Sequence, residues 1–319
     1  MNVAVVIIGR NEGARLLACL DSLKGQGLRL VYVDSGSSDG SVAAARAVGA
    51  EVVELDRATP FTAARARNAG FEALGADLPE AVHFVDGDCI VEPGWIEAAV
   101  AALAGDSSLG LVTGWRSEIY PEASVYNALC DHEWHRPAGE IVACGGDMLL
   151  RVAAYRAVGG FDGQIIASED EEFCQRLRKA RWRLMRLPLP MTRHDAAMTR
   201  FDQWWRRAVR SGHGFAQVGE MHPGYFARER ARVWAYGLAL PVLALGGLFW
   251  WPLLVAVLAA YAMSYAKTAQ GLRAGGMGTR AALHQAMFLS LSKFPNLIGM
   301  LTYKLRKWQG VAMQIIEYK

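Results

Sequence analysis

Three apolar segments early in the chain each end abruptly in a polar turn, and this alternation constrains the fold more than any other feature. The segments are residues 2–8, 30–33 and 82–85. Leucines at helical spacing follow the first segment over residues 14–23, and a polar turn that can cap a helix through Ala47 follows the second. A further strand is expected at residues 51–55. This alternation predicts an α/β fold with a mostly parallel central sheet and right-handed crossovers.

The third apolar segment ends in Asp86-Gly87-Asp88, two carboxylates separated by a glycine. Ligands of parallel sheets bind beyond the carboxyl ends of the strands, where Arg10 and Asp34 are also expected. Carboxylates at such an edge suit Mg²⁺ or Mn²⁺, which prefer one or two carboxylates together with substrate phosphates. The pair predicts a divalent-cation site for a leaving diphosphate, with a solvated turn after a strand as the alternative.

The turn after the first strand excludes two familiar nucleotide sites. Gly9-Arg10-Asn11-Glu12-Gly13 lacks the three-glycine spacing of a dinucleotide-binding turn, and it lacks the terminal Gly-Lys-Ser/Thr of a Walker loop. Any nucleotide bound at this edge of the sheet is therefore expected to be held by a different set of residues.

Five short motifs together resemble a known family. They are Ile7-Ile8-Gly9-Arg10-Asn11-Glu12, Val33-Asp34-Ser35-Gly36-Ser37-Ser38-Asp39-Gly40, Ala66-Arg67-Asn68-Ala69-Gly70, Asp86-Gly87-Asp88 and Ser168-Glu169-Asp170. In this order, over about the first 215 residues, the chain resembles the inverting, nucleotide-sugar-dependent glycosyltransferases of family 2. The resemblance implies the A-type glycosyltransferase fold, a nucleotide-sugar donor and a divalent cation, either Mn²⁺ or Mg²⁺.

The resemblance also implies which residues meet the nucleotide. These are Ile8, Gly9, Arg10, Glu12, Asp34, Ser35, Arg67, Asp86, Gly87 and Asp88. Uridine is the favoured base, because Asp34 and the Ser35 hydroxyl can accept and donate hydrogen bonds at its polar edge. The chain departs from many members of the family at Ile8-Gly9, where they have Pro-Thr, and at Asp34-Ser35, where they have paired aspartates. Arg65 is an alternative cation to Arg67.

A cation site is implied by the same resemblance. Asp88 holds the cation, with Asp86 beside it, and a later histidine, His194, is a further candidate ligand. A bound cation would neutralise the diphosphate as it leaves. A single histidine in a polar stretch is more often a surface or hydrogen-bonded residue than a metal ligand, so the role of His194 stays open at this point.

Acids gather in residues 168–172 at the start of an expected helix that becomes basic toward its end. This order of charges complements the helix dipole, and it also coincides with the Glu-Asp motif of the family. By resemblance, Asp170 is the general base that takes the proton from the acceptor hydroxyl, and Glu169 holds either the acceptor or a neighbouring residue. One displacement would then invert the anomeric centre.

The middle of the chain is expected to meet the acceptor. The candidate residues are Trp134, Gly145, Gly146, Asp147, Trp204, Trp205 and Arg206. Trp134 would stack on a sugar, with an ordinary amphipathic helix as the alternative. Residues 203–207 partly resemble the Gln-x-x-Arg-Trp motif of polysaccharide synthases, but Arg207 replaces the tryptophan. This run indicates an acceptor-site or membrane-surface element and gives no support to processive synthesis.

The stretch from Trp234 to Ala266 has no charged residue and no histidine, and it exceeds the roughly 20 residues that cross a bilayer. Pro241, Gly246-Gly247 and Pro252 interrupt it, and basic residues flank both ends, which the positive-inside tendency would place on one side. A re-entrant or interfacial helical hairpin satisfies both features. One kinked transmembrane helix and a soluble core segment are the alternatives. Residues 281–303 look amphipathic.

These features predict a catalytic domain at residues 1–230, with a nucleotide half of about 1–115 and an acceptor half of about 116–230, and a helical membrane-associated region at 231–319.

The five scattered cysteines and a strand beginning at the N-terminus predict a reducing compartment and no signal peptide. Residues 176–232 contain fourteen Lys/Arg against four Asp/Glu, which suits anionic lipid headgroups. Nucleic acid is a poorer partner, because the chain has no recognised module for it.

The sequence therefore predicts a metal-dependent transferase at the cytoplasmic face of the bacterial inner membrane. It would move one sugar, from a UDP-sugar in the favoured case, to a lipid-linked or saccharide acceptor in polysaccharide or glycolipid biosynthesis. A sugar nucleotidyltransferase is disfavoured, because residues 9–16 lack a Gly-x-Gly-x-x-Arg turn. A non-catalytic membrane-tethered module is disfavoured by the intact Asp86-Gly87-Asp88 and Glu169-Asp170.

Overall fold

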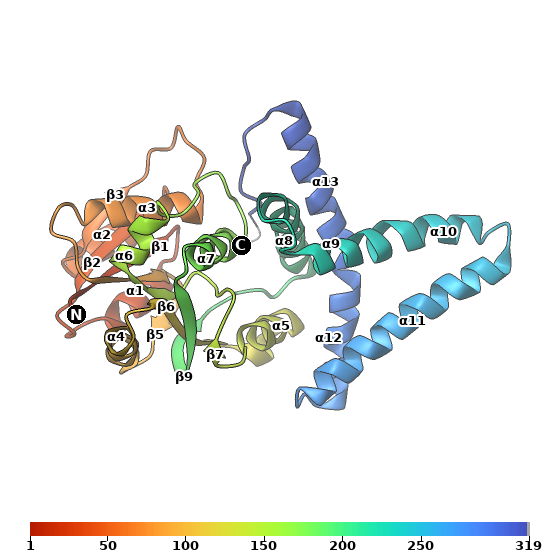
Figure 1. The fold of residues 1–319 in the computed structure, drawn as a ribbon, viewed down its shortest axis with the longest axis horizontal. Coiled ribbons are helices and arrows are strands. Elements are labelled where there is room, and N and C mark those ends of the chain that lie inside the picture. Colours follow the sequence, from red (N-terminus) through yellow and green to blue (C-terminus); the bar gives the residue numbers. More distant parts are fainter. Residues whose placement is uncertain (318–319) are drawn as a thin grey trace. The chain divides into compact units, whose positions relative to one another are not determined.

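The computed structural model describes residues 1–317, which form two compact units (Figure 1). The α/β unit comprises Met1–Ala123 and Cys130–Ala197. The helical unit comprises Ser124–Leu129 and the described residues from Met198 onward. The expected boundary at residue 230 falls inside the helical unit, because residues 198–230 pack with the C-terminal helices.

The α/β unit contains the strands and the first helices of the chain. The strands are β1 (Val3–Gly9), β2 (Arg29–Asp34), β3 (Glu51–Glu54), β4 (Ala81–Asp86), β5 (Cys89–Val91), β6 (Leu109–Glu118), β7 (Gly139–Glu140), β8 (Met148–Arg151) and β9 (Arg183–His194). The helices are α1 (Ala14–Ser22), α2 (Ser41–Ala47), α3 (Ala63–Ala73), α4 (Trp95–Gly105), the 3₁₀ turn η1 (Pro121–Ala123), α6 (Val152–Ala157) and α7 (Glu169–Lys179). Helix α5 (Val125–Trp134) contributes residues to both units.

The first half of the sheet is parallel, as the alternation of strands and helices predicts. The strand order is β3-β2-β1-β4-β8-β6-β9-β5, and β1 pairs in parallel with both β2 and β4. The register places Gly9 beside Asp34 and Ile8 beside Asp86. The predicted gathering of polar residues at one edge of the sheet is thereby confirmed.

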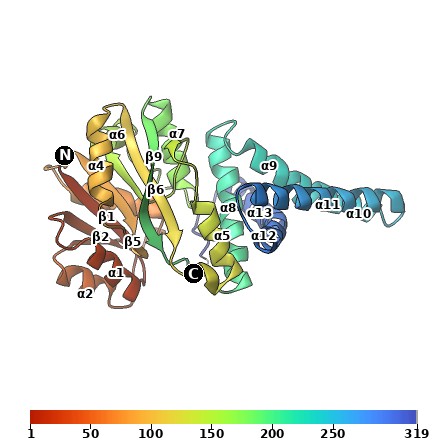
Figure 2. The ribbon, with the colours of Figure 1, turned by 90° about the horizontal axis from the view of Figure 1, so that it is seen from below.

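Helices cover both faces of this sheet (Figure 2), so side chains of β1 alternate between two cores. Val5 and Ile7 pack in the core that α1 and α4 complete, whereas Val6 and Ile8 pack in the core of α3, α6 and α7. Burial on both faces explains why the strand is a continuous apolar run, since neither face needs polar side chains.

The second half of the sheet is mixed, and the sequence did not indicate it. Strand β8 runs antiparallel to both β4 and β6, while the long strands β6 and β9 run parallel to each other. Strand β9 contains Pro188 and Pro190, and the register with β6 shifts around Trp115 in this region. Such irregularities accommodate prolines that a regular ladder rejects. At its end β9 pairs His194 with Cys89.

The helical unit is held together by a close crossing of its two longest amphipathic helices. Its helices are α8 (Phe201–Met221), α9 (Ala227–Val233), the π-helical segment η2 (Trp234–Ala239), α10 (Leu240–Gly246), α11 (Trp251–Ala274), α12 (Thr279–Leu291) and α13 (Lys293–Gln309). A side chain at Gly212 of α8 would meet the carbonyl oxygen of Asn296 at 2.0 Å, and one at Gly299 of α13 would meet that of Val209 at 1.9 Å. The glycines thus allow the two backbones to touch.

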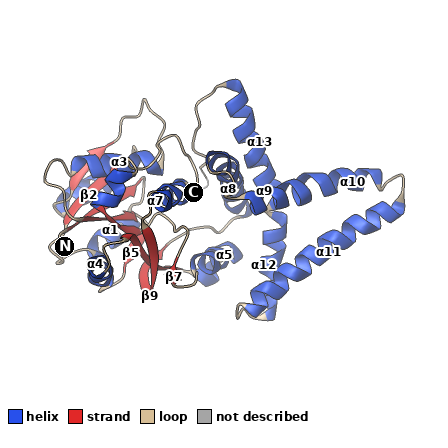
Figure 3. Cartoon of the chain, viewed as in Figure 1, coloured by secondary structure: helices blue, strands red, loops and turns tan. Residues whose placement is uncertain are grey.

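Residues 234–274 form a helical hairpin, drawn as two helices joined by a tight turn in Figure 3. Helix α10 packs on α11, and the Tyr261 hydroxyl donates a hydrogen bond to the carbonyl of Tyr236. Helix α11 is long and apolar enough to cross a membrane. The stretch 281–303, expected as one amphipathic segment, forms two helices, α12 and α13, on either side of Ser292.

Candidate active site

Asp34, at the end of β2, holds the turn that follows it. Its carboxylate accepts hydrogen bonds from the backbone N–H groups of Gly36 (2.9 Å) and Ser37 (2.8 Å) and from the hydroxyl of Tyr32 (3.2 Å). The Ser37 hydroxyl accepts from the backbone of Asn11 (2.9 Å), which ties this turn to the turn after β1. Asp34 is only 3% exposed. Its first role is therefore to fix the wall of the site.

Backbone hydrogen bonds join the other strand ends in the same way. The N–H of Ser35 donates to the carbonyl of Gly9 (3.0 Å), and the N–H of Gly87 donates to that of Ile8 (2.7 Å). Arg10 is exposed and lies over the ring of Phe61. Most of the residues expected to meet a nucleotide thus lie at or just after the ends of the neighbouring strands β1, β2 and β4, whereas Arg67 lies in α3.

Arg67 links the strand ends to the acidic start of α7. Its guanidinium donates to Asp86 Oδ1 (3.0 Å) and to Glu169 Oε1 (2.8 Å), and the residue is 2% exposed. Burial opposes its charge, but Asp86 and Glu169 outweigh this effect and keep the pKa of Arg67 above its ordinary value. A side chain at Gly146 would begin 2.0 Å from Arg67 Nη2. The glycine is therefore needed for the arginine to reach both acids.

A second arginine in the site, the partly exposed Arg116 of β6, was missed by the sequence analysis. It donates to Asp147 Oδ2 (2.9 Å) and pairs with Asp86 Oδ2 at 3.3 Å. Asp147 also accepts a hydrogen bond from the Thr192 hydroxyl (2.7 Å) and is 1% exposed. Burial would raise the pKa of Asp147, but Arg116 and Thr192 outweigh it, so the pKa is lowered. Asp147, expected to meet the acceptor, also accepts a hydrogen bond from the backbone N–H of Asp86 (3.3 Å), so its contacts are with Asp86, Arg116 and Thr192.

Asp88 and His194 form a pair at the same edge of the sheet. His194 Nε2 lies 3.2 Å from Asp88 Oδ2, and each side chain is less than a tenth exposed. The rings of Trp134 and His194 form a T-shaped contact with centroids 4.7 Å apart, and the guanidinium of Arg116 lies over the Trp134 ring. One ligand atom from each of Asp88, Cys89 and His194 lies within 4.8 Å of the others. The expected juxtaposition of Asp88 and His194 is thus present.

Asp170 lies in the first turn of α7, next to the Arg67–Glu169 ion pair. Burial, reinforced by the charge of Glu169, raises the pKa of Asp170 to about 7. A Cβ atom at Gly145 would lie 3.8 Å from Asp170 Oδ2, which is an ordinary van der Waals contact, so this glycine lies beside the carboxylate without a steric clash. A carboxyl group with a pKa near neutrality can take up and release a proton under physiological conditions.

The remaining acceptor candidates, Trp204, Trp205 and Arg206, belong to α8 of the helical unit. Trp204 is 5% exposed and packs against Tyr126 and Phe288 of that unit. Arg206 is exposed. The structure therefore accounts for Trp204 as a packing residue within the helical unit.

Residues 4–146, from β1 to the glycine beside Arg67, match the family described as Glycosyl transferase family 2. The chain is also 30% identical over 235 residues to the pre-mycofactocin glycosyltransferase of Mycobacterium tuberculosis (strain H37Rv), an alignment that covers 70% of this chain. The α/β unit of this chain belongs to glycosyltransferase family 2. The chain spans about half the length of that mycobacterial relative, 48% of which is covered.

Solved structures show the same fold for this family 2 glycosyltransferase domain. The mannosyltransferase PcManGT of Pyrobaculum calidifontis superimposes with a TM-score of 0.59 at 19% identity, covering 96% of this chain and 87% of the other. TarS residues 1–349 of S. aureus superimpose with a TM-score of 0.52 at 15% identity, covering 98% and 93%. These likenesses show the A-type glycosyltransferase architecture of the α/β unit.

Proposed function

We propose that the chain is an inverting glycosyltransferase that moves one sugar from a nucleotide diphosphate sugar to an acceptor hydroxyl. The observation that carries the proposal is the link from Asp86 through Arg67 to Glu169. It joins the strand ends, where family 2 members are expected to bind the donor, to the helix that presents Asp170. Donor binding and proton removal thereby belong to one connected group of side chains.

The donor is proposed to lie along the turns that follow β1, β2 and β4. The solved PcManGT structure is a complex with GDP-Man and Mn²⁺, and that of TarS is a complex with UDP-GlcNAc, so the fold accepts both bases. Asp34 and Ser35 remain our candidates for meeting the base. We favour uridine, because a carboxylate and a hydroxyl match the donor and acceptor groups on its edge.

The cation is proposed to bind at Asp88 and His194, with Asp86 nearby. The residues fit Mn²⁺ or Mg²⁺, because a carboxylate and an imidazole lie within 3.2 Å of each other. The buried Nδ1 of His194 has no hydrogen-bond partner within residues 1–317. The site has more acids than arginines, so without a cation this edge of the sheet would repel a diphosphate. The acids are Asp86, Asp88, Asp147, Glu169 and Asp170, and the arginines are Arg67 and Arg116. When bound, the cation supplies positive charge against the diphosphate.

Asp170 is proposed to take the proton from the acceptor hydroxyl. Its pKa of about 7 gives the carboxylate more basic strength than an ordinary aspartate has, while leaving a large fraction of it ionised near neutral pH. Glu169 is held by Arg67 and so cannot easily share the proton. We propose that Glu169 fixes the position of the start of α7, and that Trp134 offers an aromatic face to a sugar.

The acceptor is proposed to be a lipid-linked saccharide, with the helical unit attached to the cytoplasmic face of a bacterial inner membrane. The support is the hairpin of residues 234–274. At its turn, Phe249 is 94% exposed and Trp250 is 62% exposed. Soluble proteins rarely expose two neighbouring large apolar side chains to this extent. Aromatic rings at such a tip suit the interface of a bilayer.

Hydrolysis of the donor in the absence of an acceptor tests the proposal, because slow transfer to water needs no knowledge of the acceptor. The full chain in detergent should hydrolyse at least one UDP- or GDP-linked hexose with Mn²⁺ or Mg²⁺ and lose this activity with a chelator. The Asp170→Asn variant serves as the control for a contaminating hydrolase. No metal-dependent hydrolysis or binding of any nucleotide sugar would contradict the proposal.

A further inference from the structure

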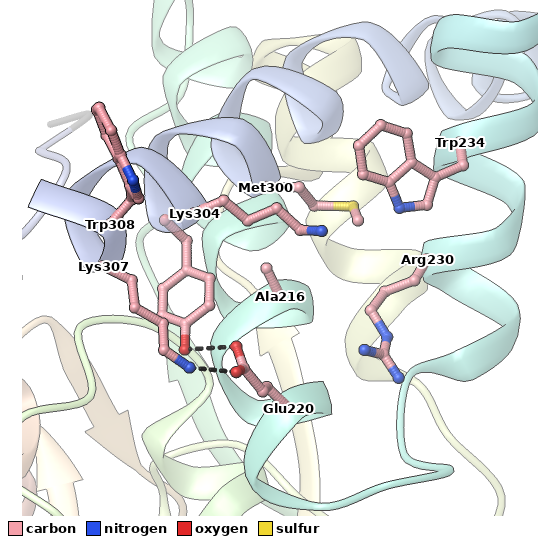
Figure 4. A pocket seen from close by; sticks show the side chains of 9 residues that line it. Ala216, Glu220, Arg230, Trp234, Met300, Lys304, Lys307 and Trp308 are labelled. Carbon is pink, nitrogen blue, oxygen red and sulfur yellow. Dashed lines mark hydrogen bonds and ion pairs between the residues drawn. The ribbon is translucent and has the colours of Figure 1, made fainter.

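A cavity of about 530 Å³ lies within the helical unit, apart from the residues assigned to transfer. Its walls come from α8, from the junction of α9 and η2, and from α13 (Figure 4). Arg230, Lys304 and Lys307 contribute cations, and Trp234 and Tyr303 contribute aromatic rings. The cavity therefore combines positive charge with apolar surface.

The single acid of the lining is neutralised within the cavity. Glu220 accepts a hydrogen bond from the Tyr303 hydroxyl (2.9 Å) and forms an ion pair with Lys307. Lys304 lies over the ring of Trp234, 5.2 Å from its centroid. The buried Nε of Arg230 has no hydrogen-bond partner in the described part of the chain. Within residues 1–317 neither Arg230 nor Lys304 forms an ion pair with a carboxylate, although the charge of Lys304 is one of the causes that lower the pKa of Glu220. Two cations in this state are the arrangement of an anion site.

The cavity lies at the base of the hairpin. Trp234 both lines the cavity and begins the uncharged run that leads into the hairpin. Trp308, on the opposite wall, is 84% exposed, so the cavity opens beside apolar surface. If the hairpin enters a bilayer, this position lies at the depth of the headgroups, where the phosphates of lipids are found.

We propose that this cavity binds the phosphate of an anionic glycerophospholipid. Arg230 and Lys304 hold the phosphate oxygens, Tyr303 and Lys307 keep Glu220 from repelling them, and Trp234 and Trp308 contact the glycerol and the first acyl carbons. The inference rests on the proposed membrane attachment and is independent of the transfer chemistry. It assigns the lipid a site of its own, separate from donor and acceptor.

Calorimetry on the full chain in neutral detergent tests the site with a short-chain phosphatidylglycerol below its micelle concentration. Wild type should bind it saturably at one site and should bind short-chain phosphatidylcholine at least tenfold more weakly. The double variant Arg230→Gln/Lys304→Gln should lose at least tenfold in affinity. The matched double variant Arg228→Gln/Lys267→Gln removes the same charge from exposed positions outside the cavity and should bind like wild type.

The outcomes separate this inference from the proposed function. Equal binding of the two lipids, or equal loss in the two double variants, would overturn the phosphate site. Inorganic phosphate that binds as tightly as the lipid would overturn the assignment to a lipid. Partition of all three proteins into neutral phosphatidylcholine vesicles reports the hairpin alone. If the proteins partition into the vesicles but wild type shows no preference for phosphatidylglycerol, only the proposed lipid site in the cavity is contradicted. If the proteins do not partition into the vesicles, the proposed membrane attachment is contradicted as well.

Discussion

His194 and Asp88 lie with Nε2 and Oδ2 3.2 Å apart, although one ends β9 and the other follows β4. The contact exists because β5 turns back after Asp88 and pairs Cys89 with His194. The pairing of the strands thus places the imidazole of His194 beside the carboxylate of Asp88. The proposed cation site therefore depends on this pairing of β5 with β9.

The close approach of Gly146 to the Arg67 side chain leads to a prediction about substitution of this glycine. Gly146→Ala would bring a carbon to 2.0 Å from Arg67 Nη2, so Arg67 must shift away from Asp86. Overpacking of this kind costs about 1–3 kcal/mol. We expect lower thermal stability and a loss of transfer in this variant. Gly145→Ala, whose nearest contact would be an ordinary 3.8 Å, is the matched control and should fold and melt like wild type.

Removing the proposed base should affect the rate more than donor binding. Asp170→Asn keeps the shape of the side chain but cannot accept the proton, so transfer should fall by roughly a hundredfold or more. In wild type, kcat/KM should rise with pH and level off above a pKa of about 7. Glu171→Gln, which removes the next acid of the same helix turn, should retain the pH profile. A wild-type rate for Asp170→Asn would transfer the role of base to Glu169.

The same carboxyl group predicts a pH-dependent change in stability. Its pKa is about 7 in the folded protein, against an ordinary value of 3.8. Between these values the folded state holds more protons than the unfolded state, so this group's contribution to stability is lost as the pH rises. Asp170→Asn should therefore melt at a higher temperature than wild type at pH 8, with a smaller advantage at pH 5. A constant difference across this range would argue against the raised pKa.

The hairpin makes a prediction about topology. If it enters and leaves one leaflet, Arg232 and Lys267 lie on the same, cytoplasmic side. The native cysteines are all buried, so Arg232→Cys and Lys267→Cys each add one accessible thiol. Both should be protected from an impermeant reagent in intact cells and react after permeabilisation. Reaction at position 267 alone in intact cells would establish a full crossing.

The strand ends could be predicted from the sequence because buried parallel strands have a local signature. Residues 2–8, 30–33 and 82–85 are nearly continuous apolar runs followed by polar turns, and parallel pairing then brings Asp34 and Asp86 to one edge. The Glu169-Asp170 pair was found through a family motif. Its link to Asp86 was not foreseen, because only the folded chain shows that Arg67 contacts both acids.

Strand β9 and Arg116 had no comparable signature. Strand β9 is hard to predict because it contains Pro188 and Pro190, and prolines disfavour regular strands. The bulges that accommodate these prolines depend on the neighbouring strand β6. Arg116 is a single arginine whose role arises from its contacts with Asp86 and Asp147 across the sheet. The extent of the helical unit depends on the close approach of α8 to α13 through Gly212 and Gly299, a pairing of distant segments that local patterns do not encode.

Calorimetric titration of UDP and GDP, with and without Mn²⁺, on wild type and Asp88→Asn tests whether Asp88 binds the cation that holds the donor diphosphate. We expect Mn²⁺ to strengthen the binding of at least one nucleotide to wild type, because the acids of the site repel a bare diphosphate. Asp88→Asn should fold like wild type and lose this strengthening. Asp88→Asn that binds nucleotide with Mn²⁺ as tightly as wild type would contradict the assignment of the cation to Asp88.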